Sequence, residues 1–165
     1  MKAVYLTGFM GSGKTSVASA LAKELSMPLF DTDEQIVSTT GKDIPAIFED
    51  DGEEAFRSYE TAILEKLPVE DVIISTGGGI ILKEDNRNLM KQCGTVIYLH
   101  CEPDEIAKRL EGDSSRPLLE GKDRSERIEK IFSERLSLYK DAHIEINTTN
   151  RTIEEIVREI RTLLG

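Results

Sequence analysis

A glycine-rich segment near the start of the chain constrains the fold more than any other feature of the sequence. Residues 8–15 read G-F-M-G-S-G-K-T, a full match to the pattern G-x-x-x-x-G-K-S/T. A short apolar run at residues 3–6 precedes this segment, and residues 14–25 carry apolar side chains at helical spacing. Such a loop turns backbone N–H groups and the positive end of a helix dipole toward one point. The pattern predicts a phosphate-binding loop (P-loop) between a buried strand and a helix.

The same segment supplies candidate nucleotide-binding residues. We expect Lys14 to bridge the β- and γ-phosphates and the Thr15 hydroxyl to be a ligand of Mg²⁺. The full set of cofactor-binding residues predicted from the motif is Gly11, Ser12, Gly13, Lys14, Thr15 and Ser16. The motif by itself leaves open ATP or GTP, and kinase or ATPase. The guanine-reading pattern N-K-x-D does not occur in the sequence.

Strand-like and helix-like patterns alternate along the rest of the chain. Further strands are predicted at 28–31, 71–75, 95–99 and 143–146. Helices are predicted at 34–40, 43–51, 53–67, 83–92, 103–110, 125–139 and 152–164. This alternation favours a single α/β domain with a mainly parallel sheet and helices on both faces. Ligands of such sheets bind at the carboxyl ends of the strands, where the motifs described here begin.

Charge and composition narrow the possible partners. The formal net charge is -10, so the surface repels both nucleic acid and anionic lipid, and neither is an expected partner. The apolar start is too short for a signal peptide or a membrane span, and Cys93 and Cys101 lack metal-binding spacing. A cytoplasmic location is therefore expected. Any anionic ligand must be captured by a local basic pocket against the overall field.

The metal carboxylate of a P-loop enzyme usually follows a neighbouring strand. The strand at 71–75 is followed by Thr76 and glycines, so Asp31 and Asp33 are the better candidates. Residues two apart on an extended segment face the same way, which would direct both carboxylates to the phosphates. We assign Asp31 to the metal, through water, and Asp33 to the acceptor hydroxyl as base or orienter. The alternative is a pair of solvated N-caps for the helix from residue 34.

Two arginines are candidates for the basic pocket. Arg135 lies about 20° from Ile128 on the helical wheel of 125–139, in the centre of its apolar stripe. An inward guanidinium needs an anionic partner, so it either lines an anion site or forms a buried ion pair. In helix 53–67, Glu60 lies within the apolar stripe three residues after Arg57. We interpret Glu60 as holding Arg57 in place for a ligand carboxylate.

Two glycine-containing segments suit a ligand site. Three consecutive glycines at 77–79 cost much backbone entropy, and Gly78 and Gly79 therefore suggest a close approach of the backbone to a ligand. The loop 112–123 has the composition of a mobile lid, and it contains Arg116. A closing lid can deliver such an arginine to the transferring phosphoryl group and exclude water. The alternative for Arg116 is a solvated surface arginine.

Taken jointly, the motifs resemble the shikimate kinase family over nearly the whole chain. The resemblance rests on G-F-M-G-S-G-K-T at 8–15, D-T-D at 31–33, I-F-E-D-D-G-E-E-A-F-R at 47–57, S-T-G-G-G at 75–79, R-P-L-L at 116–119 and R-L-S-L-Y at 135–139. It implies a doubly wound, nucleoside-monophosphate-kinase-like fold with a five-stranded parallel sheet. It also implies a lid at about 112–123 and a substrate-binding helical segment at about 33–60.

The resemblance also implies roles for single residues. Shikimate would be held by Asp33, Arg57, Gly78, Gly79 and Arg135, with the two arginines on its carboxylate. Lys14 and Arg116 would contact the transferring phosphoryl group, Thr15 and Asp31 would hold magnesium, and Arg109 would stack on adenine. The loop 147–150, which closes the other side of adenine in the family, has no clear signature here.

The resulting hypothesis is a monomeric enzyme that transfers the γ-phosphoryl group of ATP to the 3-hydroxyl of shikimate. Its catalytic residues would be Lys14, Asp33 and Arg116. One rival is another small hydroxy-acid kinase, such as a gluconate kinase. A second rival is a nucleotide-binding regulator without catalysis, and the presence of Lys14, Asp31, Asp33 and Arg116 disfavours it.

Overall fold

The computed structural model describes residues 1–111 and 124–165. Within these residues the chain forms a five-stranded sheet in the order β2-β3-β1-β4-β5, and each neighbouring pair is parallel. The strands are β1 (Ala3–Thr7), β2 (Leu29–Asp31), β3 (Ile73–Ser75), β4 (Gly94–His100) and β5 (Ile144–Asn147). The predicted α/β fold with a five-stranded parallel sheet is confirmed.

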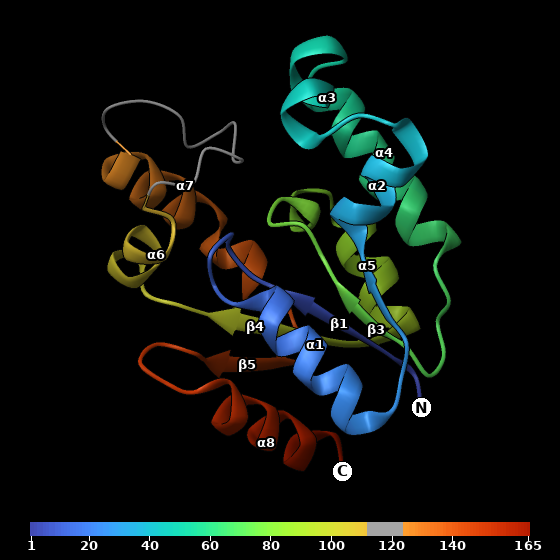
Figure 1. Ribbon diagram of the computed structural model, residues 1–165, viewed down its shortest axis with the longest axis vertical. Coiled ribbons are helices and arrows are strands. Elements are labelled where there is room, and N and C mark those ends of the chain that lie inside the picture. The colour runs from blue at the N-terminus through green and yellow to red at the C-terminus, as the bar shows by residue number, and fades with distance from the viewer. Residues whose placement is uncertain (112–123) are drawn as a thin grey trace.

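Helices cover both faces of the sheet (Figure 1). The helices α1 (Lys14–Leu25) and α8 (Ile153–Leu164) lie together on one face. The other face is covered by α4 (Glu53–Lys66), α5 (Glu84–Cys93), α6 (Pro103–Arg109) and α7 (Arg124–Tyr139). The two short helices α2 (Thr32–Thr40) and α3 (Ile44–Asp50) stand with α4 beyond the end of the sheet.

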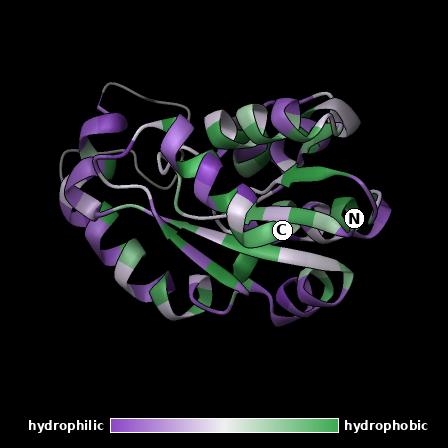
Figure 2. Cartoon of the chain, turned by 90° about the horizontal axis from the view of Figure 1, so that it is seen from below, coloured by the Kyte–Doolittle hydropathy of each residue, from purple (hydrophilic) through white to green (hydrophobic). Residues whose placement is uncertain are grey.

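The central strand β1 shows why the sheet is buried on both sides. Its side chains alternate between two apolar clusters, with Tyr5 in the cluster under α4 to α7 and Val4 and Leu6 in the cluster under α1 and α8. All of them are at most 1% exposed. Figure 2 shows the same pattern, with apolar strands inside and polar outer faces on the helices. Two-sided burial is what a parallel sheet with crossover helices requires.

The register of the sheet brings three strand ends together. Leu6 pairs with Ser75, and Ser75 also stands opposite Asp31 across the other edge of β3. The segments that follow β1, β2 and β3 therefore leave the sheet side by side at its carboxyl edge. These segments are the P-loop, the start of α2 and the glycines at 77–79, so the topology itself assembles the candidate site.

Most predicted bounds agree with the structure to within two residues, and α1 agrees at both ends. The predicted strand at 71–75 is shorter because β3 begins at Ile73. A short 3-10 helix, η1 (Ile80–Leu82), was not predicted and continues the turn of the glycines. Cys93 and Cys101 are free thiols, of which Cys101 is buried. Over 1–111 and 124–165, no helix is long and apolar enough to cross a bilayer.

Candidate active site

The P-loop wraps around the amino end of α1. Gly13 occupies the N-cap position of this helix and has no side chain to cap it, so the first N–H groups of α1 remain available to an anion. Lys14 is buried, and its Nζ donates to the carbonyl oxygens of Gly8 at 2.5 Å and Phe9 at 3.2 Å. The ammonium group is thus held inside the curl of the loop, where it favours a bound polyphosphate.

A cleft of about 350 Å³ opens beside the P-loop. Its lining residues come from the P-loop and α1, from the start of α2 and from the glycine segment: Met10, Gly11, Gly13, Lys14, Thr15, Ser16, Asp31, Asp33, Glu34, Ser75, Thr76, Gly77 and Gly78. The cleft therefore combines a cationic phosphate loop with four hydroxyl-bearing residues and three carboxylates. Thr15 and Ser16 are exposed to it, whereas Ser12 is buried beneath the loop.

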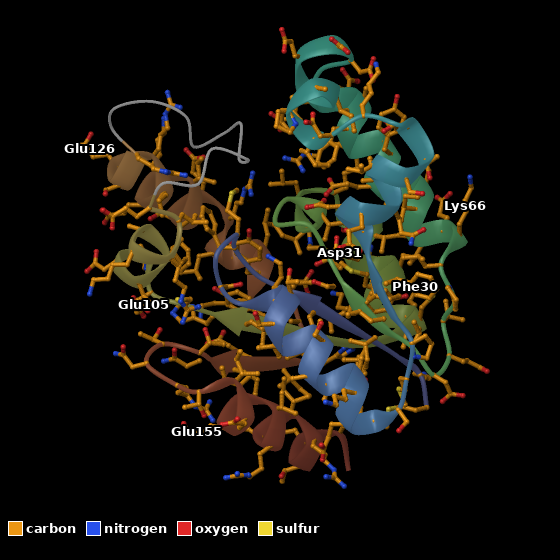
Figure 3. All side chains as sticks on the ribbon, viewed as in Figure 1. Phe30, Asp31, Lys66, Glu105, Glu126 and Glu155 are labelled. Carbon is orange, nitrogen blue, oxygen red and sulfur yellow. The ribbon has the colours of Figure 1, made fainter. Side chains whose placement is uncertain are left out.

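Asp31 and Asp33 both reach this cleft, but not from the extended segment that was predicted. Asp31 ends β2 and caps α2, because its side chain accepts a hydrogen bond from the Glu34 N–H at 3.1 Å. Asp33 already lies in the first turn of α2. The helix starts two residues earlier than predicted because aspartate is a strong N-cap. Capping and cleft lining are therefore compatible here. Figure 3 labels Asp31 at the point where β2 runs into α2.

Arg57 and Glu60 form a buried ion pair on α4. Arg57 Nη1 donates to Glu60 Oε1 at 2.9 Å, as their spacing predicts, and Arg57 Nη2 lies 3.4 Å from Glu53 Oε2. Arg57 is 8% exposed and Glu60 is fully buried. Burial raises the pKa of Glu60 to about 7, although Arg57 acts to lower it. Among the described residues, Arg57 Nε and Glu60 Oε2 have no hydrogen-bond partner.

Arg135 points inward from α7, as the helical periodicity predicts. It is 6% exposed, and within the described part of the chain its Nη1 has no hydrogen-bond partner. Its charge acts on Glu60 and on Tyr139, lowering the pKa of both groups against the effect of burial. A guanidinium this buried costs free energy unless an anion completes its hydrogen bonds. The charges of Arg57 and Arg135 both act on Glu60, so the two predicted members of the basic pocket lie near one another.

The glycine segment at 77–79 touches the other groups of the site. A Cβ atom built on Gly77 would lie 2.6 Å from Asp33 Oδ1 and 3.0 Å from Glu60 Oε2. A Cβ on Gly79 would lie 2.3 Å from Arg57 Nη1. A side chain at either position would displace these groups, so the two glycines allow the carboxylates and the guanidinium to approach the backbone. The close approach seen at this segment is to protein side chains, and the approach of a ligand stays a prediction.

A second cavity, of about 250 Å³, lies on the other side of the P-loop. Arg109 lines it, and its Nη1 donates to the carbonyl oxygen of Gly11 at 3.2 Å. Thr148 closes another wall, where its hydroxyl donates to His100 O at 2.9 Å and lies 3.4 Å from Ser12 O. The loop 147–150 is therefore tied to the P-loop. This cavity is open, partly apolar and adjacent to the phosphate cradle.

Comparison with known proteins identifies the family. The family model described as shikimate kinase matches residues 10–164. A shikimate kinase of Bacillus cereus (strain AH187) is 50% identical over 161 residues, which cover 98% of this chain and 97% of that protein. The chain belongs to the shikimate kinase family.

Solved structures agree with this assignment. The shikimate kinase from Acinetobacter baumannii in complex with shikimate superposes with a TM-score of 0.95 at 35% identity, covering 99% of this chain and 93% of that one. A gluconokinase from Sinorhizobium meliloti 1021 gives a TM-score of 0.55 at 19% identity, covering 95% of this chain and 87% of that one. The second likeness shows the fold alone. The comparisons favour a shikimate kinase over the gluconate kinase alternative.

Several residues around this shikimate kinase site were missed from the sequence. Thr32 and Tyr139 contact the glycine segment through their hydroxyl groups, and Thr148 contacts the P-loop. Each partner lies at least 45 positions away along the chain, so local spacing carries no signal of it. The predicted lid at 112–123, with Arg116, lies outside the described residues.

Proposed function

We propose that this member of the shikimate kinase family transfers the γ-phosphoryl group of ATP to the 3-hydroxyl of shikimate. The products are shikimate 3-phosphate and ADP, in the pathway to chorismate and the aromatic amino acids. The observation that carries the proposal is the pair of buried arginines beside the P-loop cleft. Arg57 and Arg135 are 8% and 6% exposed, and each has a guanidinium nitrogen without a partner among the described residues. A carboxylate with a nearby hydroxyl is the ligand that such a pocket fits.

The nucleotide phosphates would lie in the P-loop. Gly11 and Gly13 line the cleft there with Ser12 buried between them, and Lys14, Thr15 and Ser16 follow at the amino end of α1. Lys14 would leave its carbonyl partners for the β- and γ-phosphates, which offer it a stronger, charge-assisted interaction. The cavity beside Arg109 and Thr148 would take the nucleobase, with the guanidinium of Arg109 stacked on it.

Magnesium fits the donor set of the cleft. Thr15 offers a hydroxyl and Asp31 a carboxylate, both lining the same cleft, and oxygen atoms of this kind are the ligands Mg²⁺ prefers. No group of three or more His, Cys, Asp or Glu residues within 1–111 and 124–165 could hold a metal on its own. This agrees with an ion bound largely by phosphate oxygens and water, with Asp31 contacting it through water. When bound, the ion neutralises charge on the phosphates.

Shikimate would lie between α4, α7 and the glycine segment. Arg57 and Arg135 would grip its carboxylate, and the backbone of Gly78 and Gly79 would line the ring. Glu60 keeps Arg57 in position for this contact. The ion pair and the close backbone hold the acceptor in one orientation before ATP reacts, which is the main source of catalysis in phosphoryl transfer.

Asp33 would act at the reacting hydroxyl. It lines the P-loop cleft and touches the glycine segment, so it faces both the phosphate loop and the acceptor pocket. The hydroxyl oxygen attacks the γ-phosphorus, the bond to the bridging oxygen of ADP breaks, and the hydroxyl proton passes to the Asp33 carboxylate. Lys14 and Arg116 would stabilise charge on the transferring group, the latter from the lid proposed at 112–123.

The wider organisation follows from the same proposal. We expect a monomer that works in the cytoplasm, with a substrate-binding helical segment at about 33–60. In the structure this segment comprises α2, α3 and the first half of α4, which stand beyond the sheet (Figure 1). We expect this segment to adjust when substrate binds.

ADP release tests the proposed function. Purified protein with MgATP is expected to release ADP far faster with shikimate than without it, and mass spectrometry should find shikimate 3-phosphate. Equal rates with and without shikimate would refute the proposal. Gluconate and other hydroxy acids serve as competitors in the same assay, because a gluconate kinase would show its largest rate with gluconate.

A further inference from the structure

The three glycines at 77–79 have no side chains, so other residues must hold this stretch of backbone in place. Gly77 abuts Asp33 and Glu60, and Gly79 abuts the guanidinium of Arg57. A shift of this backbone by a fraction of an ångström would therefore move the contacts of both the acceptor base and the carboxylate grip. Glycine is also the residue that loses most conformational freedom on ordering. A site built on three of them requires fixed points.

One fixed point is a hydroxyl on α2. The Gly77 N–H donates to Thr32 Oγ1 at 2.9 Å, and Thr32 is completely buried between Asp31 and Asp33. The glycine segment is thereby bound to the same helical turn that carries the candidate base. Because Thr32 is buried, solvent does not reach the Gly77 N–H to replace the hydroxyl as its hydrogen-bond partner.

The second fixed point is a hydroxyl on α7. The Tyr139 hydroxyl donates to the Gly78 carbonyl oxygen at 2.5 Å, and the charge of Arg135 acts on the same hydroxyl. The Tyr139 ring is stacked on Tyr98, with ring centroids 5.2 Å apart and an interplanar angle of 4°. Tyr98 comes from β4, so the sheet holds the ring whose hydroxyl contacts the glycine segment.

We propose that Thr32 and Tyr139 are positioning residues that clamp the glycine segment from opposite sides and set the acceptor pocket. The inference rests on the proposed function, and it goes beyond it by assigning a role to two residues that need not touch substrate. Tyr139 also lies four residues after Arg135 on α7, so the hydroxyl that holds Gly78 comes from the same face of the helix as that guanidinium. Loss of either clamp should weaken shikimate binding and leave nucleotide binding intact.

The test compares Tyr139→Phe with Tyr98→Phe. Both variants remove one buried hydroxyl from the same ring stack, but the Tyr98 hydroxyl contacts His100 Nδ1 at 2.9 Å rather than the glycine segment. We expect Tyr139→Phe to raise the KM for shikimate about 10-fold, since the Gly78 carbonyl loses its buried donor. The KM for ATP should stay within about twofold of wild type, and Tyr98→Phe should leave both constants within the same range.

Thr32→Val provides a second, independent variant. Valine keeps the branched shape of threonine but cannot accept the Gly77 hydrogen bond, so the KM for shikimate should again rise about 10-fold at an unchanged KM for ATP. Melting temperatures of all variants, with and without shikimate, accompany the kinetics. The shikimate-induced rise should shrink in Tyr139→Phe and Thr32→Val but not in Tyr98→Phe.

Three outcomes would overturn the inference. The first is a wild-type KM for shikimate in both clamp variants, and the second is an equal rise in the KM values for shikimate and ATP. The third is a Tyr139→Phe protein that is unfolded at the assay temperature, because its hydroxyl would then be structural. An inactive wild type would instead refute the proposed function itself, so the two failures are distinguishable.

Discussion

The carboxylate of Glu60 is fully buried and accepts a hydrogen bond from Arg57 at 2.9 Å. This arrangement fixes the guanidinium while leaving its Nε without a partner in the described residues. A second carboxylate, Glu53, lies 3.4 Å from the other side of the guanidinium but is 49% exposed. The buried Arg57–Glu60 pair should therefore orient the guanidinium more strongly than the Arg57–Glu53 pair, because an exposed ion pair is screened by water.

Glu60→Gln is expected to weaken shikimate binding. The amide can still accept from Arg57 but no longer carries the charge that orients it, so the KM for shikimate should rise about 10-fold. The matched control is Glu53→Gln, which should change this KM by less than about twofold. Steady-state kinetics with shikimate as the varied substrate measure both. Equal effects of the two substitutions would contradict the distinction between buried and exposed partners.

The raised pKa of Glu60, about 7, predicts a pH-dependent stability. Between pH 4.5 and about 7 the folded protein binds more protons at this site than the unfolded chain, whose glutamate has its ordinary pKa of 4.5. The free energy of unfolding that this group contributes is therefore present at low pH and is lost as the pH rises through that window.

Glu60→Gln isolates this contribution, since glutamine does not titrate. Urea unfolding of both proteins at pH 5 and pH 8 gives the unfolding free energy of wild type minus that of Glu60→Gln. This difference should be more positive at pH 5 than at pH 8. Other titrating groups are shared by the two proteins and cancel in the difference. A difference in unfolding free energy that stays constant between the two pH values would argue that Glu60 has no raised pKa.

The sequence predicted the parts of this site that depend on short-range patterns. The inward direction of Arg135 follows from helical periodicity, and the Arg57–Glu60 pair follows from a spacing of three residues on a helix. The start of α2 was misplaced because Asp31 both ends a strand and caps a helix. The capping hydrogen bond of Asp31 starts the helix at Thr32, whereas the sequence pattern predicted an extended chain through Asp33.

The hydroxyl contacts of the glycine segment could not be predicted in the same way. Tyr139 belongs to the apolar stripe of α7, and its ring is buried as that stripe requires. Its hydrogen bond to Gly78 spans 61 positions and depends on how α7 packs beside η1 and the glycine segment. Such a contact is set by the topology of the sheet and not by the spacing of residues around it. The structure was needed to find it.

Lys14→Met should affect the chemical step. Methionine keeps most of the buried length of lysine but removes the ammonium group, which lies within the curl of the P-loop. Loss of one charge-stabilising donor is expected to lower kcat about 10²–10³-fold. Lys23→Met, on the exposed face of the same helix, is the matched control and should leave kcat unchanged. An active Lys14→Met protein would contradict the assignment.

Asp33→Asn should lower turnover without unfolding the protein. Asparagine has the size of aspartate and can still orient a hydroxyl, but it cannot accept a proton, so kcat should fall about 10²–10⁴-fold. The KM for ATP should change little because Asp33 lies on α2 rather than on the P-loop. Rapid-quench measurement of a single turnover separates the chemical step from product release. Full turnover by this variant would remove Asp33 from the proton transfer.

Arg135→Ala distinguishes a ligand-binding arginine from a structural one. Its guanidinium is 6% exposed and, in the part of the chain that the structure describes, one of its nitrogens lacks a partner. Because a buried, incompletely bonded charge does not favour the folded state, its removal should cost little stability. Loss of a charge-assisted grip on the substrate carboxylate should instead weaken shikimate binding more than about 100-fold. Calorimetric titration with shikimate and thermal melting measure the two effects separately.

Lys130→Ala, on the exposed face of the same helix, is the control and should change neither shikimate binding nor the melting temperature. Unchanged shikimate binding together with a large fall in melting temperature would show that Arg135 belongs to a buried ion pair and not to the substrate site.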